Sequence, residues 1–585
     1  MQKPQANQEF SAWNPGLNPL IPKPYQSLES IYQVMNVTSQ FSDTAELAAL
    51  TGLRPEELVA FSAERLVLHE LIIRVCADIV IPEEKEEEAL GRHFRHICHH
   101  LLKVYLAPHQ DEVKKIHEAL RQRAEQRVQQ ILTESLFPPP VSDKPAKTRF
   151  SLFALLTGKK PSVTQKRHYE PLHETLWDRE YQQLNRFREA GLTAQDAFER
   201  SVYKSMYQVL GALASKQGYI GSDRQLLTDL IVQNVCNTYG SQLIGAYISP
   251  YILQAAKQEA YPLSRPAQKP ILISLKGASA AGKSSLRPML QHIMAQQGIA
   301  AKGYCTISPD IWRRLLLDYD SLGDAYKYAG ALTSNEVNVI DSKLDRYIRD
   351  KAQRDQSIPH LLVDRFRFDS FASDKVSHIL HDTYAKYIDT LYMYFVITPP
   401  EDTVVRGWER GLQRGRYKAV EDFLGFSVEA YIGMPKLLFK WLAYRRPRFN
   451  YVFLDNSVAK GTRPKTIAFG DQDVMNIHNP MAFVNIERYQ KINIKARCPA
   501  EVYPEKTDFS VANNIGFLQQ CLSRIAQINF IDEETGNCYL EVEHGQVKLL
   551  DLSLFKSQLV NQAWQPIFNI IAPKLMKSLQ DEAQG

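Results

Sequence analysis

The chain has 585 residues, of which 70 are basic and 65 acidic, with a net charge of +5 and 44% hydrophobic residues. This composition is that of a folded globular protein of about three or four domains. The near balance of charge argues against nucleic acid as the main partner. No run of about 18 apolar residues occurs, so no membrane span is expected.

The seven cysteines and the N-terminus bear on the cellular compartment. The cysteines are scattered and form no C-x-x-C pair, which argues against a disulfide framework or a zinc site and fits a reducing environment. The first 25 residues lack the apolar core of a secretory signal peptide. We therefore expect a soluble cytoplasmic protein. Delivery into another cell by a dedicated secretion system would leave no readable mark.

The first half of the chain predicts helices. Residues 1–40 are rich in Pro, Asn and Gln and are expected to be extended or disordered. Apolar residues at helical spacing predict a bundle over 41–137, and three prolines then start a linker over 138–169. A second helical region follows over 170–262, and the helical regions together are a candidate surface for a protein partner. The clearest helices are expected over 86–106, 111–136, 172–190, 194–216 and 223–255.

Five histidines gather in the first bundle. A metal site is one interpretation of this cluster, but the nearby acids form an exposed-looking run and offer no obvious carboxylate partner. We therefore favour histidines on a solvated helix face. The five residues are His93, His96, His99, His100 and His109.

Strands and helices alternate between residues 263 and 470. This alternation implies a parallel sheet with right-handed crossovers, in which the ligand lies at the carboxyl ends of the strands. Helices are expected between the strands, one of them over 375–391. The predicted strands cover 271–275, 300–307, 359–363, 392–397 and 451–455.

A phosphate-binding motif follows the first of these strands. The residues read G-x-x-x-x-G-K-[ST] between a predicted strand and a predicted helix, the context that a P-loop requires. Gly277 and Gly282 let the backbone curl so that its N–H groups face a phosphate, and the next helix points its positive end at the same anion. Lys283 can reach the β- and γ-phosphates, and Ser284 can place a hydroxyl on Mg²⁺. The predicted nucleotide-binding residues are Gly277, Ala278, Ser279, Ala280, Ala281, Gly282, Lys283, Ser284 and Ser285.

Two acids end the next two strands. Asp310 would stand across from the γ-phosphate, where a carboxylate can orient or deprotonate an acceptor hydroxyl. Its alternative role is that of an acid at a helix N-terminus. Asp364 would hold Mg²⁺ through water, or would be a turn residue at the end of its strand.

Arginines recur along the helix expected over 401–414. Arg406, Arg410 and Arg414 are spaced i, i+4, i+8 and share one face. Guanidinium groups stabilise the charge that spreads over a transferring phosphoryl group. The alternative is a surface helix whose arginines pair with nearby acids.

Together these residues resemble the zeta-toxin group of P-loop kinases over about residues 265–470. The resemblance is carried by the P-loop with its Ser-Leu-Arg continuation, by Asp310 followed by Ile-Trp-Arg-Arg, and by LLVDRFRF after the third strand. The Pro-Pro-Glu helix with Arg410, the sequence Gly415-Arg416-Tyr417 and the late strand YVFLDNS are also similar. Where the family has an acid-Gly-Thr-like sequence, this chain has Asp364-Arg365-Phe366.

Zeta toxins are bacterial kinases that phosphorylate UDP-N-acetylglucosamine or related UDP-sugars on a sugar hydroxyl. The resemblance implies that Lys283 binds phosphates and that Ser284 meets Mg²⁺. It also implies that Asp310 is the base and that Arg410 and Arg416 stabilise the transfer. The implied cofactors are ATP and Mg²⁺.

The predicted fold class is an α/β P-loop kinase domain with a parallel sheet over 263–470. A large α-helical region precedes it, and a smaller α+β domain over 471–585 follows, with a hairpin at His544-Gly545 and helices over 554–579. The leading hypothesis for function is an ATP-dependent kinase of a small-molecule hydroxyl, such as that of a UDP-sugar. The alternatives are a nucleotide-gated interaction protein without kinase chemistry and a kinase of protein or nucleotide.

Overall fold

The computed structural model describes residues 10–137, 176–364, 385–459 and 461–584. No helix in these ranges is both long and apolar enough to cross a membrane. The chain forms two compact units that do not follow the order of the expected domains, so the predicted domain boundaries stay a prediction. Unit 1 comprises residues 1–33, 68–108 and 248–585, and unit 2 comprises 34–67 and 109–247.

The described residues of unit 2 form mainly helices, with one isolated bridge between Val37 and Phe61. Its helices carry the cap residues that the sequence offers: the Asp196 carboxylate accepts from the Glu199 N–H, and the helix that starts there ends at Gly218 with φ of 83°. The expected helix over 223–255 is divided by one π-helical turn at Cys236–Gly240. The helices are α2 (Phe41–Thr51), α3 (Pro55–Leu58), α6 (Gln110–Ser135), α7 (Leu176–Thr193), α8 (Ala197–Gln217) and α9 (Arg224–Val235), while α4 (Ala63–Asp78) and α10 (Ser241–Gln258) cross the boundary between units.

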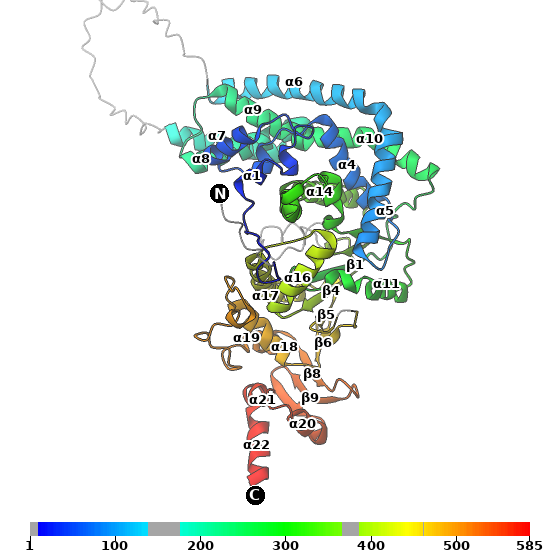
Figure 1. Ribbon diagram of the computed structural model, residues 1–585, viewed down its shortest axis with the longest axis vertical. Coiled ribbons are helices and arrows are strands. Elements are labelled where there is room, and N and C mark those ends of the chain that lie inside the picture. The colour runs from blue at the N-terminus through cyan, green and yellow to red at the C-terminus, as the bar shows by residue number, and fades with distance from the viewer. Residues whose placement is uncertain (1–9, 138–175, 365–384, 460, 585) are drawn as a thin grey trace, which may run out of the picture. The chain divides into compact units, whose positions relative to one another are not determined.

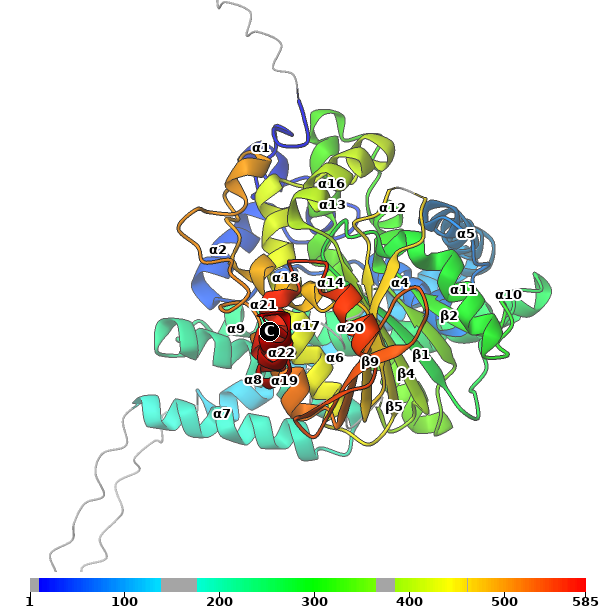
Figure 2. The same cartoon turned by 90° about the horizontal axis from the view of Figure 1, so that it is seen from below.

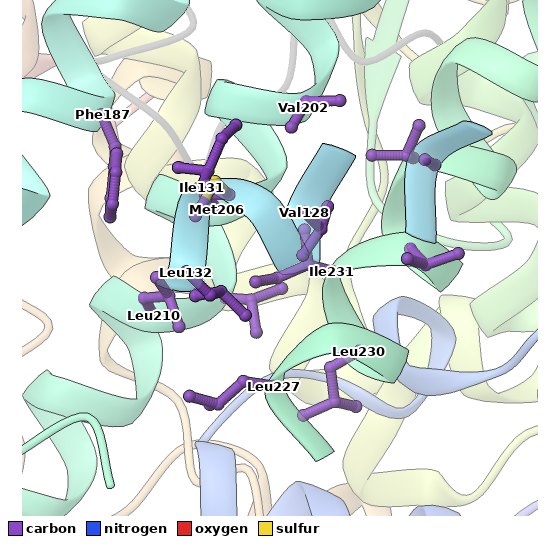
Figure 3. Close-up of a cluster of buried hydrophobic side chains, with 14 of the residues drawn as sticks. Val128, Ile131, Leu132, Phe187, Val202, Met206, Leu210, Leu227, Leu230 and Ile231 are labelled. Atoms are coloured by element: carbon purple, nitrogen blue, oxygen red, sulfur yellow. The ribbon is translucent and has the colours of Figure 1, made fainter. Parts of the chain in front are cut away.

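An apolar cluster holds the described helices of unit 2 together. It is built from the inward faces of α6, α8 and α9 with part of α7 (Figure 3). Val202, Met206 and Leu210 recur at i, i+4, i+8 on α8 and are fully buried, as the helical period of the sequence requires. Each such side chain contributes about 1.5–3 kcal/mol by leaving water.

Unit 1 is organised around one ten-stranded sheet. Its strand order is β10-β9-β8-β7-β6-β5-β4-β1-β3-β2, and Figure 1 shows the labelled strands β1, β4, β5 and β6 in that sequence. The strands are β1 (Ile271–Gly277), β2 (Tyr304–Ile307), β3 (His360–Val363), β4 (Thr390–Ile397), β5 (Arg448–Asp455), β6 (Lys465–Gly470), β7 (Val474–Ile477), β8 (Gln527–Ile531), β9 (Cys538–Glu543) and β10 (Gln546–Leu549).

The first five strands are all parallel, which confirms the expected parallel sheet. The central strand β1 is buried on both faces, and Leu272 and Ile273 are fully inaccessible. Such a strand reads as a continuous apolar run because helices cover both faces of a parallel sheet. All five carboxyl ends therefore lie along one edge, and this edge positions the site.

Strands β6 to β10 extend the same sheet beyond β5, mostly in antiparallel pairs. The sequence predicted a separate α+β domain from residue 471 and did not indicate that its strands join the sheet. The predicted hairpin is confirmed, because β9 and β10 pair around His544-Gly545, both with positive φ. Independent folding of 471–585 stays a prediction.

Helices flank the sheet of unit 1, and α17 packs against β1 (Figure 2). The helix expected over 375–391 falls largely outside the described residues, and its last two positions, Thr390 and Leu391, belong to β4 instead, where apolar neighbours complete a buried strand. The helices are α1 (Lys23–Gln26), α5 (Glu87–His100), α11 (Arg287–Gln296), α12 (Arg313–Leu316), α13 (Ala329–Leu332), α14 (Ser334–Asp355), α16 (Pro400–Arg414), α17 (Val420–Leu442), α18 (Met481–Arg488), α19 (Gly516–Arg524), α20 (Leu552–Gln558), α21 (Gln565–Ile571) and α22 (Pro573–Gln584).

Candidate active site

Two glycines of the loop after β1 lie where a larger residue would not fit. A Cβ on Gly277 would approach the Val396 carbonyl to 2.8 Å, and a Cβ on Gly282 would collide with the side-chain amide of Asn456. Gly282 also has φ of 90°, and Ala280 has φ of 63°, a conformation that a non-glycine residue rarely adopts. The loop is thus held tightly where it leaves the sheet.

Side chains that follow two neighbouring strands hold this loop by hydrogen bonds to one of its backbone carbonyl groups. Ala281 O accepts from Asn456 Nδ2 at 2.7 Å and from Thr398 Oγ1 at 3.0 Å. Asn456 follows β5 and Thr398 follows β4. Asn456 directly follows the strand that the sequence predicts over 451–455, whereas no sequence pattern indicated a role for Thr398.

The two side chains after Gly282 point in different directions. Lys283 Nζ donates to Gly277 O and Ala278 O, each at 2.9 Å, so the ammonium lies under the loop. Burial lowers the pKa of Lys283, and the charges of Asp364 and Asp310 partly oppose that shift. Ser284 Oγ donates instead to Glu87 Oε2 at 3.2 Å.

Asp310 lies in a short 3-10 turn directly after β2. Its Oδ1 accepts from Arg313 Nε at 2.8 Å, and its Oδ2 accepts from Arg416 Nη2. The carboxylate is therefore held from both sides by guanidinium groups, and it remains partly exposed. The sequence predicted Asp310 and Arg416 but gave Arg313 no role.

Asp364 follows β3 and is almost completely buried. Its Oδ2 accepts a long bond from Ser308 Oγ at 3.5 Å, while its Oδ1 has no hydrogen-bond partner among the described residues. Burial raises the pKa of Asp364, the ammonium of Lys283 opposes this, and Glu87 adds to it. Arg365, Phe366 and Arg367, which also belonged to the predicted strand end, lie outside the described residues.

The three arginines of α16 differ in what they contact. Arg406 donates to the Val458 carbonyl at 3.0 Å, and Arg414 Nη1 lies 3.7 Å from Glu87 Oε2. Burial lowers the pKa of Arg410 to about 10, and its neighbour Arg416 adds to this shift. The Nε atom of Arg410 lacks a hydrogen-bond partner within the described part of the chain. A guanidinium in this state has bonding capacity for an anion.

Arg416 is placed by a turn that leaves the helix. Gly415 ends α16 with φ of 68°, which directs the next residue back toward Asp310. Burial alone would lower the pKa of Arg416, but the carboxylates of Asp310 and Glu87 outweigh it and raise the pKa. Arg410 and Arg416 both lie near Asp310, and their proposed roles in phosphoryl transfer stay a prediction.

The residue that sequence reasoning missed most clearly is Glu87. It comes from an acidic run, residues 83–88, that looked exposed, yet its side chain is buried and contacts both Ser284 and Arg416. Of the five clustered histidines, His93 pairs with Glu84 and His100 pairs with Glu259, so the expectation that the nearby acids offer no partner was wrong for His93. In the residues that are described, no group of three or more His, Cys, Asp or Glu is arranged to hold a metal ion.

A pocket opens beside Asp310. One wall is α5, and the others come from the segments after β2 and α16. Five arginines and three acids line it, and Arg95, Arg313 and Arg416 pair with these acids. The residues that line it are Glu87, Glu88, Gly91, Arg95, Asp310, Ile311, Arg313, Arg314, Tyr319, Arg414 and Arg416.

No protein-family model and no curated protein sequence matches the chain. Among solved structures, the crystal structure of AvrRxo1-ORF1:-ORF2 with ATP matches 39% of this chain and 66% of its own, with 13% identity and a TM-score of 0.29. The native AvrRxo1-ORF1:-ORF2 complex matches 40% of this chain and 66% of its own, with 12% identity and a TM-score of 0.27.

The PezAT chromosomal toxin-antitoxin system of Streptococcus pneumoniae matches 47% of this chain and 93% of its own, with 14% identity and a TM-score of 0.27. The chain thus spans just under two thirds of the two AvrRxo1-ORF1:-ORF2 structures. At these TM-scores the likenesses carry no argument about this chain.

Proposed function

We propose that unit 1 is an ATP-dependent phosphotransferase of zeta-toxin type, which moves the γ-phosphate of ATP to a hydroxyl of a small molecule such as a UDP-sugar. The observation that carries the proposal is the meeting of Asp310 with Arg416 at the carboxyl edge of a parallel sheet, next to a glycine-restricted loop that ends in Lys283. Ligands bind at this edge in α/β sheets.

Each residue has a role that its position supports. The loop from Gly277 to Ser285 cradles the phosphates with its backbone N–H groups, and Lys283 turns from its carbonyl partners to the β- and γ-phosphates. Asp310 accepts the proton of the acceptor hydroxyl as that oxygen attacks phosphorus. Arg410 and Arg416 hold the charge that builds on the equatorial oxygens.

The residues present fit a magnesium ion. Ser284 and Asp364 offer hard oxygen ligands, and the Asp364 carboxylate has an unpaired buried oxygen within the described residues. Mg²⁺ is commonly bound by one or two protein oxygens together with waters and substrate phosphates, so a larger ligand cluster is not needed. When bound, the ion would neutralise charge on the β- and γ-phosphates.

The proposal is tested by transfer of labelled γ-phosphate from ATP with Mg²⁺ to a panel of UDP-sugars, nucleosides and cell extract. The wild-type chain is compared with Lys283→Ala. We expect label on one small molecule and its loss in the variant. A nucleotide-gated interaction protein would bind ATP without transferring label, and a protein kinase would label protein in the extract.

A further inference from the structure

Glu87 is the first residue of α5, and its carboxylate lies inside the proposed phosphate site. Its Oε2 accepts from Ser284 Oγ at 3.2 Å and from Arg416 Nη1 at 2.9 Å. The same oxygen lies 3.7 Å from Arg414 Nη1, and Oε1 accepts from Ser308 Oγ at 3.4 Å. With 5% of its surface exposed, the residue is almost closed off from water.

These partners are the groups that a nucleotide phosphate would need. Ser284 carries the hydroxyl proposed for the metal ion, and Arg416 carries a guanidinium proposed for the transferring phosphoryl group. One anionic oxygen that meets a P-loop hydroxyl and two guanidinium groups has the charge and the contacts of a phosphate oxygen. Glu87 and a phosphate cannot use the same donors at the same time.

A second carboxylate fastens the same segment. Glu83 Oε2 lies 3.2 Å from Arg287 Nη1 and Oε1 accepts from the Thr306 hydroxyl. The side chains of Glu83 and Arg287 are only 3% and 2% exposed. Because Arg287 begins α11 and Thr306 lies in β2, Glu83 holds the segment to the kinase-like core without using a phosphate-binding side chain.

A different role for Glu87 would be that of an additional magnesium ligand beside Ser284. A ligand of the ion would strengthen the binding of metal and nucleotide, and its loss would weaken it. The geometry favours competition, since Oε2 takes the guanidinium donors as well as the hydroxyl. A magnesium ligand would have to lie near Ser284 but would not need contacts with the guanidinium groups.

We infer that residues 83–88 are an intramolecular competitor of the nucleotide, with Glu87 occupying the position of a phosphate oxygen until the segment is displaced. The inference rests on the phosphate-binding roles given above. If the site is open in only a fraction of the molecules, the apparent affinity for the ligand is the affinity of the open site multiplied by that fraction. Loss of the Glu87 charge therefore raises the apparent affinity for nucleotide.

The test is calorimetric binding of a non-hydrolysable ATP analogue with Mg²⁺ to the full chain. Glu87→Gln keeps the size of the side chain and removes its charge. We expect it to bind at least about tenfold more tightly than wild type, as expected if nine in ten molecules are closed. The matched control is Glu84→Gln, which removes a charge from the same segment, where Glu84 pairs with exposed His93, and should bind within about twofold of wild type.

Unchanged binding by Glu87→Gln would overturn the inference, and weaker binding would do so in favour of a metal ligand. If that variant does not fold, hydrogen exchange of the wild type decides the question, since backbone amides of residues 83–95 should exchange faster at saturating nucleotide. Equal or slower exchange contradicts displacement.

Calorimetry combined with the labelled-phosphate transfer assay on the same proteins separates this inference from the proposed function. If Glu87→Gln binds the analogue more tightly but phosphate is transferred to no acceptor, the competition by residues 83–88 is supported. The proposed phosphotransferase activity is then contradicted. Absence of binding in both proteins contradicts both.

Discussion

Arg313 Nε donates at 2.8 Å to Oδ1 of Asp310, which lies three residues earlier in the chain. The other end of this guanidinium is anchored, because its Nη1 donates to Gly330 O at 2.6 Å and to Thr333 Oγ1 at 2.8 Å. Arg313 is nearly buried and has little freedom to move. It therefore positions the proposed base against a fixed part of the fold.

Arg313→Lys should lower kcat by about tenfold to a hundredfold, because a shift of about 1 Å in a catalytic group costs up to 10² in rate. The lysine keeps the charge and loses the planar fork that joins Asp310 to its anchors. Nucleotide affinity should stay within about twofold, which a general loss of structure would not allow. Steady-state kinetics and analogue binding measure both quantities.

The control for this variant is Arg349→Lys, which alters an arginine paired with Asp345 along one helix face. Both kcat and affinity should be unchanged there. If Arg313→Lys changed affinity as much as kcat, a role in positioning Asp310 would be ruled out.

Asp310→Asn removes the proposed base and keeps its shape. Loss of a general base costs about 10²–10⁴ in rate, and we expect that fall in kcat at saturating ATP. Binding of the ATP analogue should persist because the loop and Lys283 are untouched. Transfer at the wild-type rate would show that another group takes the proton.

Much of this arrangement could be predicted from the sequence, because strong local patterns carry it. The buried strands are continuous apolar runs, and the loop after β1 has a fixed glycine spacing whose reason is the close approach of Val396 and Asn456. Asp310 and Asp364 could be placed because parallel strands bring their carboxyl ends to one edge.

The rest depends on contacts between distant parts of the chain. The acidic run at 83–88 has the composition of a solvated helix start, and only its pairing with Arg287 and Arg416, some 200 and 330 residues away, buries Glu83 and Glu87. The addition of β6 to β10 is less distant, because β5–β6, β6–β7, β8–β9 and β9–β10 are consecutive strands and only β7–β8 joins strands far apart in the chain. The sequence indicates the β9–β10 hairpin, but it contains no local sign that these strands join the parallel sheet or that the acidic run is buried.

A buried lysine in unit 1 should make stability depend on pH. Lys343 Nζ lies 3.1 Å from His69 Nδ1, and His69 Nε2 lies 2.7 Å from Glu336 Oε1. Burial lowers the pKa of Lys343 to about 7; Arg346 adds to this, while Glu70 and Glu336 oppose it. An unfolded lysine titrates near 10.4, so between about pH 7 and 10 the unfolded chain binds the extra proton.

Raising the pH through this window therefore favours the folded state, by up to about 1.4 kcal/mol per pH unit from this one group. Lys343→Met should remove that part of the rise, whereas Lys302→Met, at an exposed position, should keep it. Melting temperatures from pH 7 to 9.5 measure the difference. Parallel pH profiles for wild type and Lys343→Met would contradict the lowered pKa of Lys343.

Gly282 and Gly298 both have positive φ but differ in their surroundings. Alanine substitutions at the two positions therefore separate the cost of backbone strain from the cost of a steric clash. Gly282 has φ of 90° and Gly298 has φ of 75°, but a Cβ on Gly298 would meet no atom within 4 Å. Gly298→Ala should cost about 1–2 kcal/mol of stability, the price of a left-handed alanine, and leave nucleotide affinity unchanged. Gly282→Ala carries the same strain and also pushes against the amide of Asn456, which holds Ala281 O.

We therefore expect Gly282→Ala to lower the melting temperature more than Gly298→Ala and to weaken binding of the ATP analogue with Mg²⁺ by at least about tenfold. The reason is that Asn456 must move, and the loop carbonyl that it fixes moves with it. Thermal melting and calorimetry on the two variants give both numbers. Equal losses of stability with full nucleotide affinity in both variants would mean that the contact between Gly282 and Asn456 does not shape the phosphate loop.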